Sequence, residues 1–183
     1  MYRYFLIAGT PAIGKSNLSS KLLSLGMAVS DLDLVRDIMA SVQSDCDVLR
    51  KSFFEITTGE YLKQCEILKP AINGMIGGIV KNKQHVVILG AHMMPGNEDK
   101  ELTRDWKKVL LTMPNEDLHW QQFCIRAEND ARQIMKDPNK LKINFQKTRD
   151  YQNFLIDQAK RHGWDIVENG GDVLDCIAKI LAL

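Results

Sequence analysis

The feature that most constrains this chain is a glycine-rich run near its start, Gly9-Thr10-Pro11-Ala12-Ile13-Gly14-Lys15-Ser16. It follows an apolar stretch, precedes a helical pattern, and matches G-x-x-x-x-G-K-[ST], the phosphate-binding P-loop. The glycines allow a backbone geometry in which N–H groups converge on phosphate oxygens, and the next helix adds its positive end. Lys15 is expected to bind the β- and γ-phosphates, and the Ser16 hydroxyl to bind Mg²⁺. We therefore predict a site for ATP and Mg²⁺ over these eight residues and Asn17.

The composition of the chain limits the kinds of partner that we expect it to bind. The chain has 183 residues and a formal net charge of +1, which fits one domain over residues 1–183. Proteins that bind nucleic-acid backbones usually carry a clear basic excess, so a nucleic-acid partner is not expected. No apolar run approaches the length of a membrane helix, so no membrane partner is expected. The four cysteines form no C-x-x-C pair and indicate reduced thiols in a cytoplasmic protein.

A P-loop on a chain of this length favours a small phosphotransferase over motor and helicase NTPases. The N-K-x-D motif that GTPases use to read their base is missing, because Asn82-Lys83 is followed by Gln84-His85. Kinases of the nucleoside-monophosphate type bind ATP at the P-loop and the acceptor over neighbouring strand ends, and close a basic lid over both.

Strand and helix patterns alternate along the whole sequence. Strands are predicted at 2–8, 27–30, 86–89, 109–112 and 165–167, and helices at 15–24, 31–42, 45–58, 60–81, 117–135, 143–162 and 173–181. Strands separated by helices form right-handed βαβ units and a parallel sheet. We predict an α/β fold, a three-layer P-loop kinase-type sandwich. Its five-stranded parallel sheet has the order 2-3-1-4-5, with helices on both faces and a helical lid at about 126–142.

The second predicted strand ends in a run that carries Asp31, Asp33 and Arg36. Carboxylates at the carboxyl end of a parallel strand point into the crevice where ligands bind. Asp33 is the candidate for contacting Mg²⁺ or for accepting a proton from the attacking hydroxyl, and Asp31 is the second candidate. Either aspartate would also suit a helix N-cap. Arg36 lies one turn beyond Asp33 and is a candidate for binding an anionic acceptor, with a surface ion pair as the alternative.

Four further basic side chains are candidates. His92 leaves the third predicted strand and is expected either to shape the acceptor pocket or to serve the core. Arg126 and Arg132 lie in the predicted lid, where arginines clamp the transferred phosphoryl group, and a solvated helix face is the alternative. Arg149 lies near the start of the return helix and is a candidate for the substrate. The turn Asn169-Gly170-Gly171-Asp172 either accepts adenine or is a plain turn with a helix cap.

Several segments recur in the same order in one known family. They are Gly9 to Ser16, Asp33-Leu34-Val35-Arg36-Asp37, Gly90-Ala91-His92-Met93-Met94-Pro95-Gly96, His119-Trp120-Gln121-Gln122-Phe123-Cys124-Ile125-Arg126, and Phe145 to Leu155. Together they resemble the 2-phosphoglycerate kinase family of P-loop kinases, whose members show D-x-x-R-E, E-G-x-H-x-x-P-G, H-x-x-R-F-x-x-R and I-R-x-x-Q-x-x-L. Gln64 also falls where that family tends to carry a glutamine.

The resemblance implies ATP- and Mg²⁺-dependent phosphorylation of a small acidic hydroxyl compound. In archaeal members that compound is 2-phosphoglycerate, which gives 2,3-bisphosphoglycerate. The motif positions fall on Asp33, Arg36, His92, Arg126 and Arg149. The chain departs from the pattern where the strand-three glutamate is Leu89 and where the arginine before the lid phenylalanine is Gln122.

The sequence therefore predicts a kinase for a small anionic acceptor. Lys15, Asp33, Arg126 and Arg132 are the expected catalytic residues, and the acceptor is expected to lie between the helix of Asp33 and Arg36 and the loop of His92. A nucleoside, nucleotide or polynucleotide-end kinase is one alternative. A non-catalytic ATP-binding sensor is the other, and Leu89 is the residue that suggests it.

Overall fold

A computed structural model describes residues 4–43, 46–82, 85–129 and 137–183. Five parallel strands form one sheet in the order β2-β3-β1-β4-β5, which confirms the predicted topology. The strands are β1 (Tyr4–Ala8), β2 (Ala28–Asp31), β3 (Val86–Gly90), β4 (Lys107–Thr112) and β5 (Asp165–Glu168). The predicted strands at these places are confirmed within one or two residues at each end.

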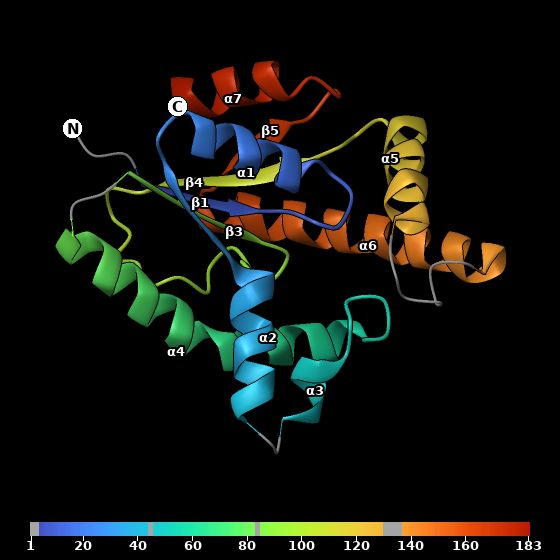
Figure 1. Cartoon of the computed structure of the whole chain (residues 1–183), viewed down its shortest axis with the longest axis horizontal. Helices are drawn as coiled ribbons and strands as arrows, with labels where there is room; N and C mark the ends of the chain where they lie inside the picture. The colour runs from blue at the N-terminus through green and yellow to red at the C-terminus, as the bar shows by residue number, and fades with distance from the viewer. Residues whose placement is uncertain (1–3, 44–45, 83–84, 130–136) are drawn as a thin grey trace.

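Helices cover both faces of this sheet (Figure 1). They are α1 (Lys15–Ser24), α2 (Leu32–Val42), α3 (Asp47–Arg50), α4 (Thr58–Asn82), α5 (Glu116–Glu128), α6 (Pro138–His162) and α7 (Val173–Ala182). Helices α1 and α7 pack on one face, and α2, α4 and α6 pack on the other. No helix within the described ranges is long and apolar enough to cross a membrane.

Successive side chains of β1 point to opposite faces of the sheet, and this explains the three layers of the fold. Phe5 and Ile7 join the core under α1 and α7, whereas Leu6 and Ala8 join the core under α4 and α6. All four side chains are buried, as expected for a central parallel strand that helices cover on both sides. Because β1, β2 and β3 are parallel, the loops that leave their carboxyl ends meet at one edge of the sheet.

The predicted helix over 45–58 is wrong beyond Arg50. In place of a helix, Phe53, Phe54 and Ile56 are buried in a third cluster with residues of α4, α5 and α6. Lys147 of α6 donates to the carbonyls of Phe54 and Ile56, at 3.0 and 3.1 Å. These carbonyls thus have side-chain partners from a distant helix, which a local periodicity does not reveal.

The helix ends beside the predicted lid also differ from those predicted. Helix α5 ends at Glu128, and α6 begins at Pro138, five residues before its expected start at 143. The Asp137 side chain accepts from the Asn139 and Lys140 N–H groups, and Pro138 suits the first helical turn. The predicted lid residue Arg132 lies outside the described residues.

Candidate active site

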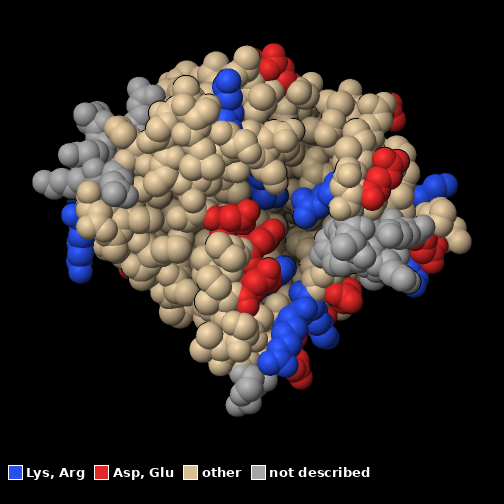
Figure 2. Space-filling view, viewed as in Figure 1, with Lys and Arg blue, Asp and Glu red and all other residues tan. Residues whose placement is uncertain are grey.

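The P-loop opens into a cavity of about 400 Å³ at the carboxyl edge of the sheet. Lysine, arginine and acidic side chains surround this hollow in Figure 2. The lining residues come from the P-loop, the ends of β2 and β3, and the last turns of α5. They are Pro11, Ala12, Gly14, Lys15, Ser16, Asn17, Asp31, Asp33, Leu89, Ala91, Gln122, Ile125, Arg126 and Asn129. The fold thus brings the P-loop, the aspartates of β2–α2 and one predicted lid arginine to the same cavity.

The P-loop backbone explains its glycines. A Cβ at Gly9 would lie 2.1 Å from Ile13 Cδ1 and 2.9 Å from the Leu111 carbonyl oxygen, so the loop can only pass β4 there as glycine. Gly14 has φ of 90°, in the left-handed region that glycine adopts without penalty. Ala12 has φ of 62° and is the one residue other than glycine with positive φ in the described ranges. Such a conformation costs on the order of 1–2 kcal/mol and needs support from its surroundings.

Lys15 lies at the centre of the charged groups. Its Nζ donates to the carbonyls of Gly9 and Thr10, at 2.8 and 2.6 Å. Burial lowers the pKa of Lys15 to about 8, and the positive charge of Arg126 acts in the same direction. Asp33 and Asp31 oppose the shift and favour the charged ammonium. The Lys15 side chain is thus held inside the loop, where its ammonium group can bind a phosphate of the nucleotide.

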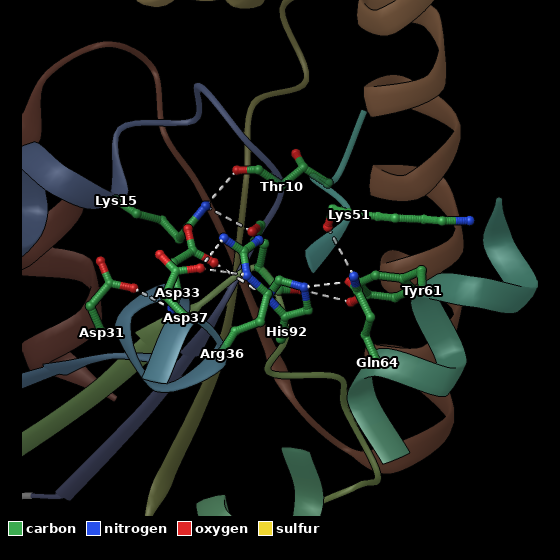
Figure 3. A network of polar contacts seen from close by, with 12 residues as sticks. Thr10, Lys15, Asp31, Asp33, Arg36, Asp37, Lys51, Tyr61, Gln64 and His92 are labelled. Atoms are coloured by element: carbon green, nitrogen blue, oxygen red, sulfur yellow. Dashed lines mark hydrogen bonds and ion pairs between the residues drawn. The ribbon is translucent and has the colours of Figure 1, made fainter. Parts of the chain in front are cut away.

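The two aspartates differ in their local bonds. The Asp31 side chain accepts from the Asp33 N–H at 2.8 Å and caps α2, so the N-cap alternative holds for Asp31. The Asp33 carboxylate lies 3.3 Å from His92 Nδ1 and its side chain is 43% exposed (Figure 3). Burial alone would raise the pKa of Asp33, but the hydrogen bond and charge of His92, with the charges of Lys15 and Arg36, hold it well below its usual range. Asp33 is therefore an ionised carboxylate at the cavity.

His92 contacts the Asp33 carboxylate but does not itself line the cavity. Its ring is buried, and Nε2 lies 2.9 Å from Gln64 Oε1. Gln64 is itself fixed, because its Nε2 donates to the Val48 carbonyl at 2.5 Å. The same Nε2 donates to the Lys51 carbonyl at 3.1 Å (Figure 3). His92 does not line the cavity in this structure, so its direct contact with an acceptor stays a prediction. Only the family resemblance indicated Gln64, since a buried glutamine in a helix carries no signal of its own.

The predicted arginines have different surroundings. Arg126 lines the cavity. Arg36 pairs with Asp37, with Nη2 to Oδ1 at 2.6 Å, so the ion-pair alternative is observed on the same turn of α2. Arg149 donates from Nη1 to the Met113 carbonyl at 2.6 Å and lies outside the cavity lining. Of these three arginines, Arg126 lines the cavity, whereas Arg36 and Arg149 do not.

Two buried side chains contact the P-loop itself, and sequence reasoning predicted neither contact. His119 lies 3.2 Å from the Pro11 carbonyl, and Asn169 donates to the Ile13 carbonyl at 2.8 Å. His119 lies in a segment of the family resemblance, and Asn169 opens the turn predicted to accept adenine. Their partners are far away in the sequence, so no local pattern could have assigned these contacts.

The comparisons with known sequences support the resemblance. A 2-phosphoglycerate kinase of Methanocaldococcus jannaschii is 26% identical over 182 residues, which cover 90% of this chain and 57% of that protein. A 2-phosphoglycerate kinase of Methanopyrus kandleri is 22% identical over 184 residues, covering 90% of this chain and 55% of that protein. The chain therefore spans a little over half the length of these relatives. No family model matches the chain.

Solved structures of small-molecule kinases share the fold. Shikimate kinase from Acinetobacter baumannii, in complex with shikimate, has a TM-score of 0.62 at 16% identity, covering 99% of this chain and 92% of that chain. A gluconokinase from Sinorhizobium meliloti 1021 has a TM-score of 0.52 at 10% identity, covering 98% of this chain and 90% of that chain. At these identities the likeness establishes the P-loop kinase fold.

Proposed function

We propose that this chain is an ATP- and Mg²⁺-dependent kinase that transfers the γ-phosphoryl group to a small acidic hydroxyl compound of the 2-phosphoglycerate type. The observation that carries the proposal is the single cavity shared by Lys15, Ser16, Asp33 and Arg126. Phosphoryl transfer depends mainly on positioning and on neutralising charge, and these residues supply both. The similarity to two 2-phosphoglycerate kinases favours this acceptor class.

Lys15 and Arg126 are assigned to the phosphates. They are the two cations of the cavity lining among the described residues. Cations that are fixed before the reaction stabilise the negative charge that spreads over the transferred group. Arg132 would add a third cation from the lid, as the sequence predicts.

Asp33 is assigned to orienting the acceptor hydroxyl. Because its pKa is held well below the usual range, it is a weak base and stays ionised. An ionised carboxylate can accept a hydrogen bond from the hydroxyl and align it with the phosphorus atom, which a loose phosphoryl-transfer transition state requires more than proton removal. We further propose that Arg36, His92 and Arg149 serve the acceptor side, directly or through their neighbours.

The oxygen atoms around the P-loop fit Mg²⁺. This ion prefers hard oxygen ligands and is usually held by one or two carboxylates together with phosphate oxygens. The Ser16 hydroxyl and the Asp33 carboxylate line the same cavity, and Asp31 lies beside them. These residues would hold Mg²⁺, which when bound neutralises phosphate charge.

The proposal is tested by ADP release from ATP and Mg²⁺ in the presence of single acceptors. The panel contains 2-phosphoglycerate, other phosphorylated and unphosphorylated hydroxy acids including shikimate, nucleosides, and 5′-hydroxyl oligonucleotides. Lys15→Ala is expected to lower kcat by at least about 10²-fold. Lys21→Ala is the matched control, because Lys21 is an exposed lysine on the same helix α1.

The outcomes separate the candidate functions. Release stimulated by 2-phosphoglycerate supports the proposal despite Leu89 and Gln122, which line the cavity where the family carries a glutamate and an arginine. ADP release that is stimulated only by nucleosides or oligonucleotides would show that the acceptor belongs to that class and not to the acidic hydroxyl compounds. ATP binding with no stimulated release by any acceptor would contradict kinase activity and favour an ATP sensor, the alternative that Leu89 suggests.

A further inference from the structure

Two buried side chains outside the cavity lining hold the P-loop by its carbonyls. His119 of α5 is fully buried, and its Nε2 lies 3.2 Å from the Pro11 carbonyl oxygen. Asn169, which follows β5, is buried and donates from Nδ2 to the Ile13 carbonyl at 2.8 Å. Neither residue lines the cavity. The carbonyls of Pro11 and Ile13 are thus directed at two side chains that do not line the cavity.

The hydrogen bonds of His119 admit one tautomer. Arg149 Nη1 lies 3.3 Å from His119 Nδ1, and a guanidinium can only donate, so Nδ1 accepts and carries no proton. The proton is therefore on Nε2, which donates to the Pro11 carbonyl. Arg149 is held in turn by the Met113 carbonyl, at 2.6 Å, so the line of contacts runs from the end of β4 to the P-loop.

The Asn169 amide is oriented just as firmly. Its Oδ1 accepts from the Gly171 N–H at 2.9 Å, which leaves Nδ2 to face the Ile13 carbonyl. Its own N–H donates to the Thr112 carbonyl at 2.7 Å, so the backbone of Asn169 is fixed to the end of β4. A Cβ at position 14 would lie 2.6 Å from Asn169 Nδ2, so Gly14 permits this close approach.

These two bonds determine where the neighbouring N–H groups point. In a trans peptide the C=O and the following N–H point in opposite directions, and no described peptide bond is cis. The N–H groups of Ala12 and Gly14 therefore point opposite to the carbonyls that His119 and Asn169 hold, and both residues line the cavity. Neither N–H has an acceptor within the part of the chain that the structure describes. The held Pro11–Ala12 peptide adjoins Ala12, whose positive φ needs such support, and the held Ile13–Gly14 peptide follows one residue later.

We propose that His119 and Asn169 are positioning residues that fix the P-loop with the Ala12 and Gly14 N–H groups aimed at phosphate. The inference rests on the proposed function, because it deepens the assignment of the same nucleotide site. The energetic logic is preorganisation: a loop already held in its binding geometry loses less conformational entropy when the phosphate arrives. Arg149 contributes through His119, by keeping the proton on Nε2.

The test measures the affinity for MgADP and for inorganic tripolyphosphate by calorimetry, with the unfolding temperature recorded for each variant. His119→Phe keeps a ring against Phe145, which packs 5.2 Å away, but it removes the donor to Pro11. Asn169→Asp keeps the acceptor for Gly171 and places an oxygen against the Ile13 carbonyl. Each change is expected to weaken both ligands about tenfold, because a buried carbonyl loses its donor.

Two further variants separate positioning from general stability. His119→Gln can both donate to a carbonyl and accept from a guanidinium, and it is expected to restore affinity to within about threefold of the unmodified protein. Asn115→Asp is the matched control for Asn169→Asp. Asn115 is the N-cap of α5, and an aspartate keeps the capping oxygen that accepts from Leu118. This control is expected to leave both affinities unchanged.

Unchanged affinities in His119→Phe and Asn169→Asp would overturn the inference, whatever their unfolding temperatures. Two-dimensional ¹H–¹⁵N NMR gives an independent check: tripolyphosphate is expected to shift the amide resonances of Ala12 and Gly14 in the unmodified protein. The absence of those shifts would also overturn it. Failure of the proposed function has a different signature, in which MgADP binds and the variants weaken it, but no acceptor stimulates ADP release.

Discussion

Gly90 is the residue at which the packing of the sheet edge can be tested most directly. It is the last residue of β3, and a Cβ there would lie 2.7 Å from Leu32 Cβ, 3.3 Å from Leu32 Cγ and 3.4 Å from Leu32 Cα. Leu32 is fully buried and is the first residue of α2, immediately before Asp33. The atoms that would collide belong to the backbone and the base of the side chain, so a rotamer change cannot relieve the overlap. The start of α2 must move.

The cost of Gly90→Ala follows from two terms. Overpacking of this kind costs about 1–3 kcal/mol. Alanine recovers about 0.5–1 kcal/mol by restricting the unfolded chain, and Gly90 does not have the positive φ that would strain it. The free energy of unfolding is therefore expected to fall by about 1 kcal/mol, the difference between the midpoints of these two ranges. For a domain of this size each kcal/mol lowers the unfolding midpoint by about 2–4 °C.

The assay is urea unfolding followed by circular dichroism, with Gly78→Ala as the matched control. Gly78 lies inside α4, and a Cβ there meets no atom within 4 Å, so alanine is expected to stabilise the protein by about 0.5–1 kcal/mol. Because α2 carries Asp33, Gly90→Ala is also expected to lower kcat more than it weakens nucleotide binding. A Gly90→Ala protein as stable as the unmodified one, beside a stabilised control, would refute the packing argument.

Three other substitutions probe separate parts of the molecule. Asp33→Asn is expected to lower kcat by about 10²-fold while MgADP affinity changes little, and steady-state kinetics checks this, with Asp175→Asn, in an exposed pair with Lys179 on α7, as control. Glu98 is buried, accepts from Trp164 Nε1 at 3.0 Å and pairs with Lys108 at 3.3 Å. Glu98→Ala is therefore expected to cost about 3–5 kcal/mol in urea unfolding, against about 0.5 kcal/mol or less for Glu101→Ala, which breaks an exposed pair with Arg104. Burial, followed by the charges of Arg149 and Lys15, lowers the pKa of His119 below its ordinary 6.5. The unfolded chain then binds the extra proton first, so stability that is present above pH 6.5 is lost as the pH falls below it, and this acid loss is expected to be smaller in His119→Phe.

The sequence predicts the fold and the centre of the site well because both depend on short-range chemistry. The P-loop motif encodes its own strand, turn and helix, and Lys15 is carried in the motif itself. Asp33 follows from the rule that ligands bind at the carboxyl ends of parallel strands. The strand order follows from the P-loop kinase type that the motif indicates, because alternating strands and helices alone also fit other parallel orders, such as 2-1-3-4-5.

The parts that the sequence does not reveal depend on contacts between distant residues. His119 and Pro11 are separated by 108 positions, and Asn169 and Ile13 by 156. The non-helical course of 51–57 likewise depends on Lys147 and on aromatic residues of three helices. Local periodicity carries no information about such partners, and a buried polar residue in a helix looks the same whether or not it has a site role.

The register of the sheet offers a physical account of the missing family glutamate. Leu89 pairs with Asp31 across β3 and β2, and residues paired in this way point to the same face of the sheet. The carboxylate of Asp31 thus lies beside the position where the family carries its acid, and it lines the same cavity. Asp31 also caps α2, but Asn caps as well as Asp, so Asp31→Asn separates the charge from the cap. This variant is expected to keep the stability within about 0.5 kcal/mol and to raise the Mg²⁺ concentration needed for half-maximal turnover several-fold. Asp172→Asn, the same exchange at the cap of α7, is the control and is expected to change neither the stability nor the Mg²⁺ requirement. An unchanged Mg²⁺ requirement in Asp31→Asn would mean that Asp31 does not replace the glutamate that the family carries at the position of Leu89.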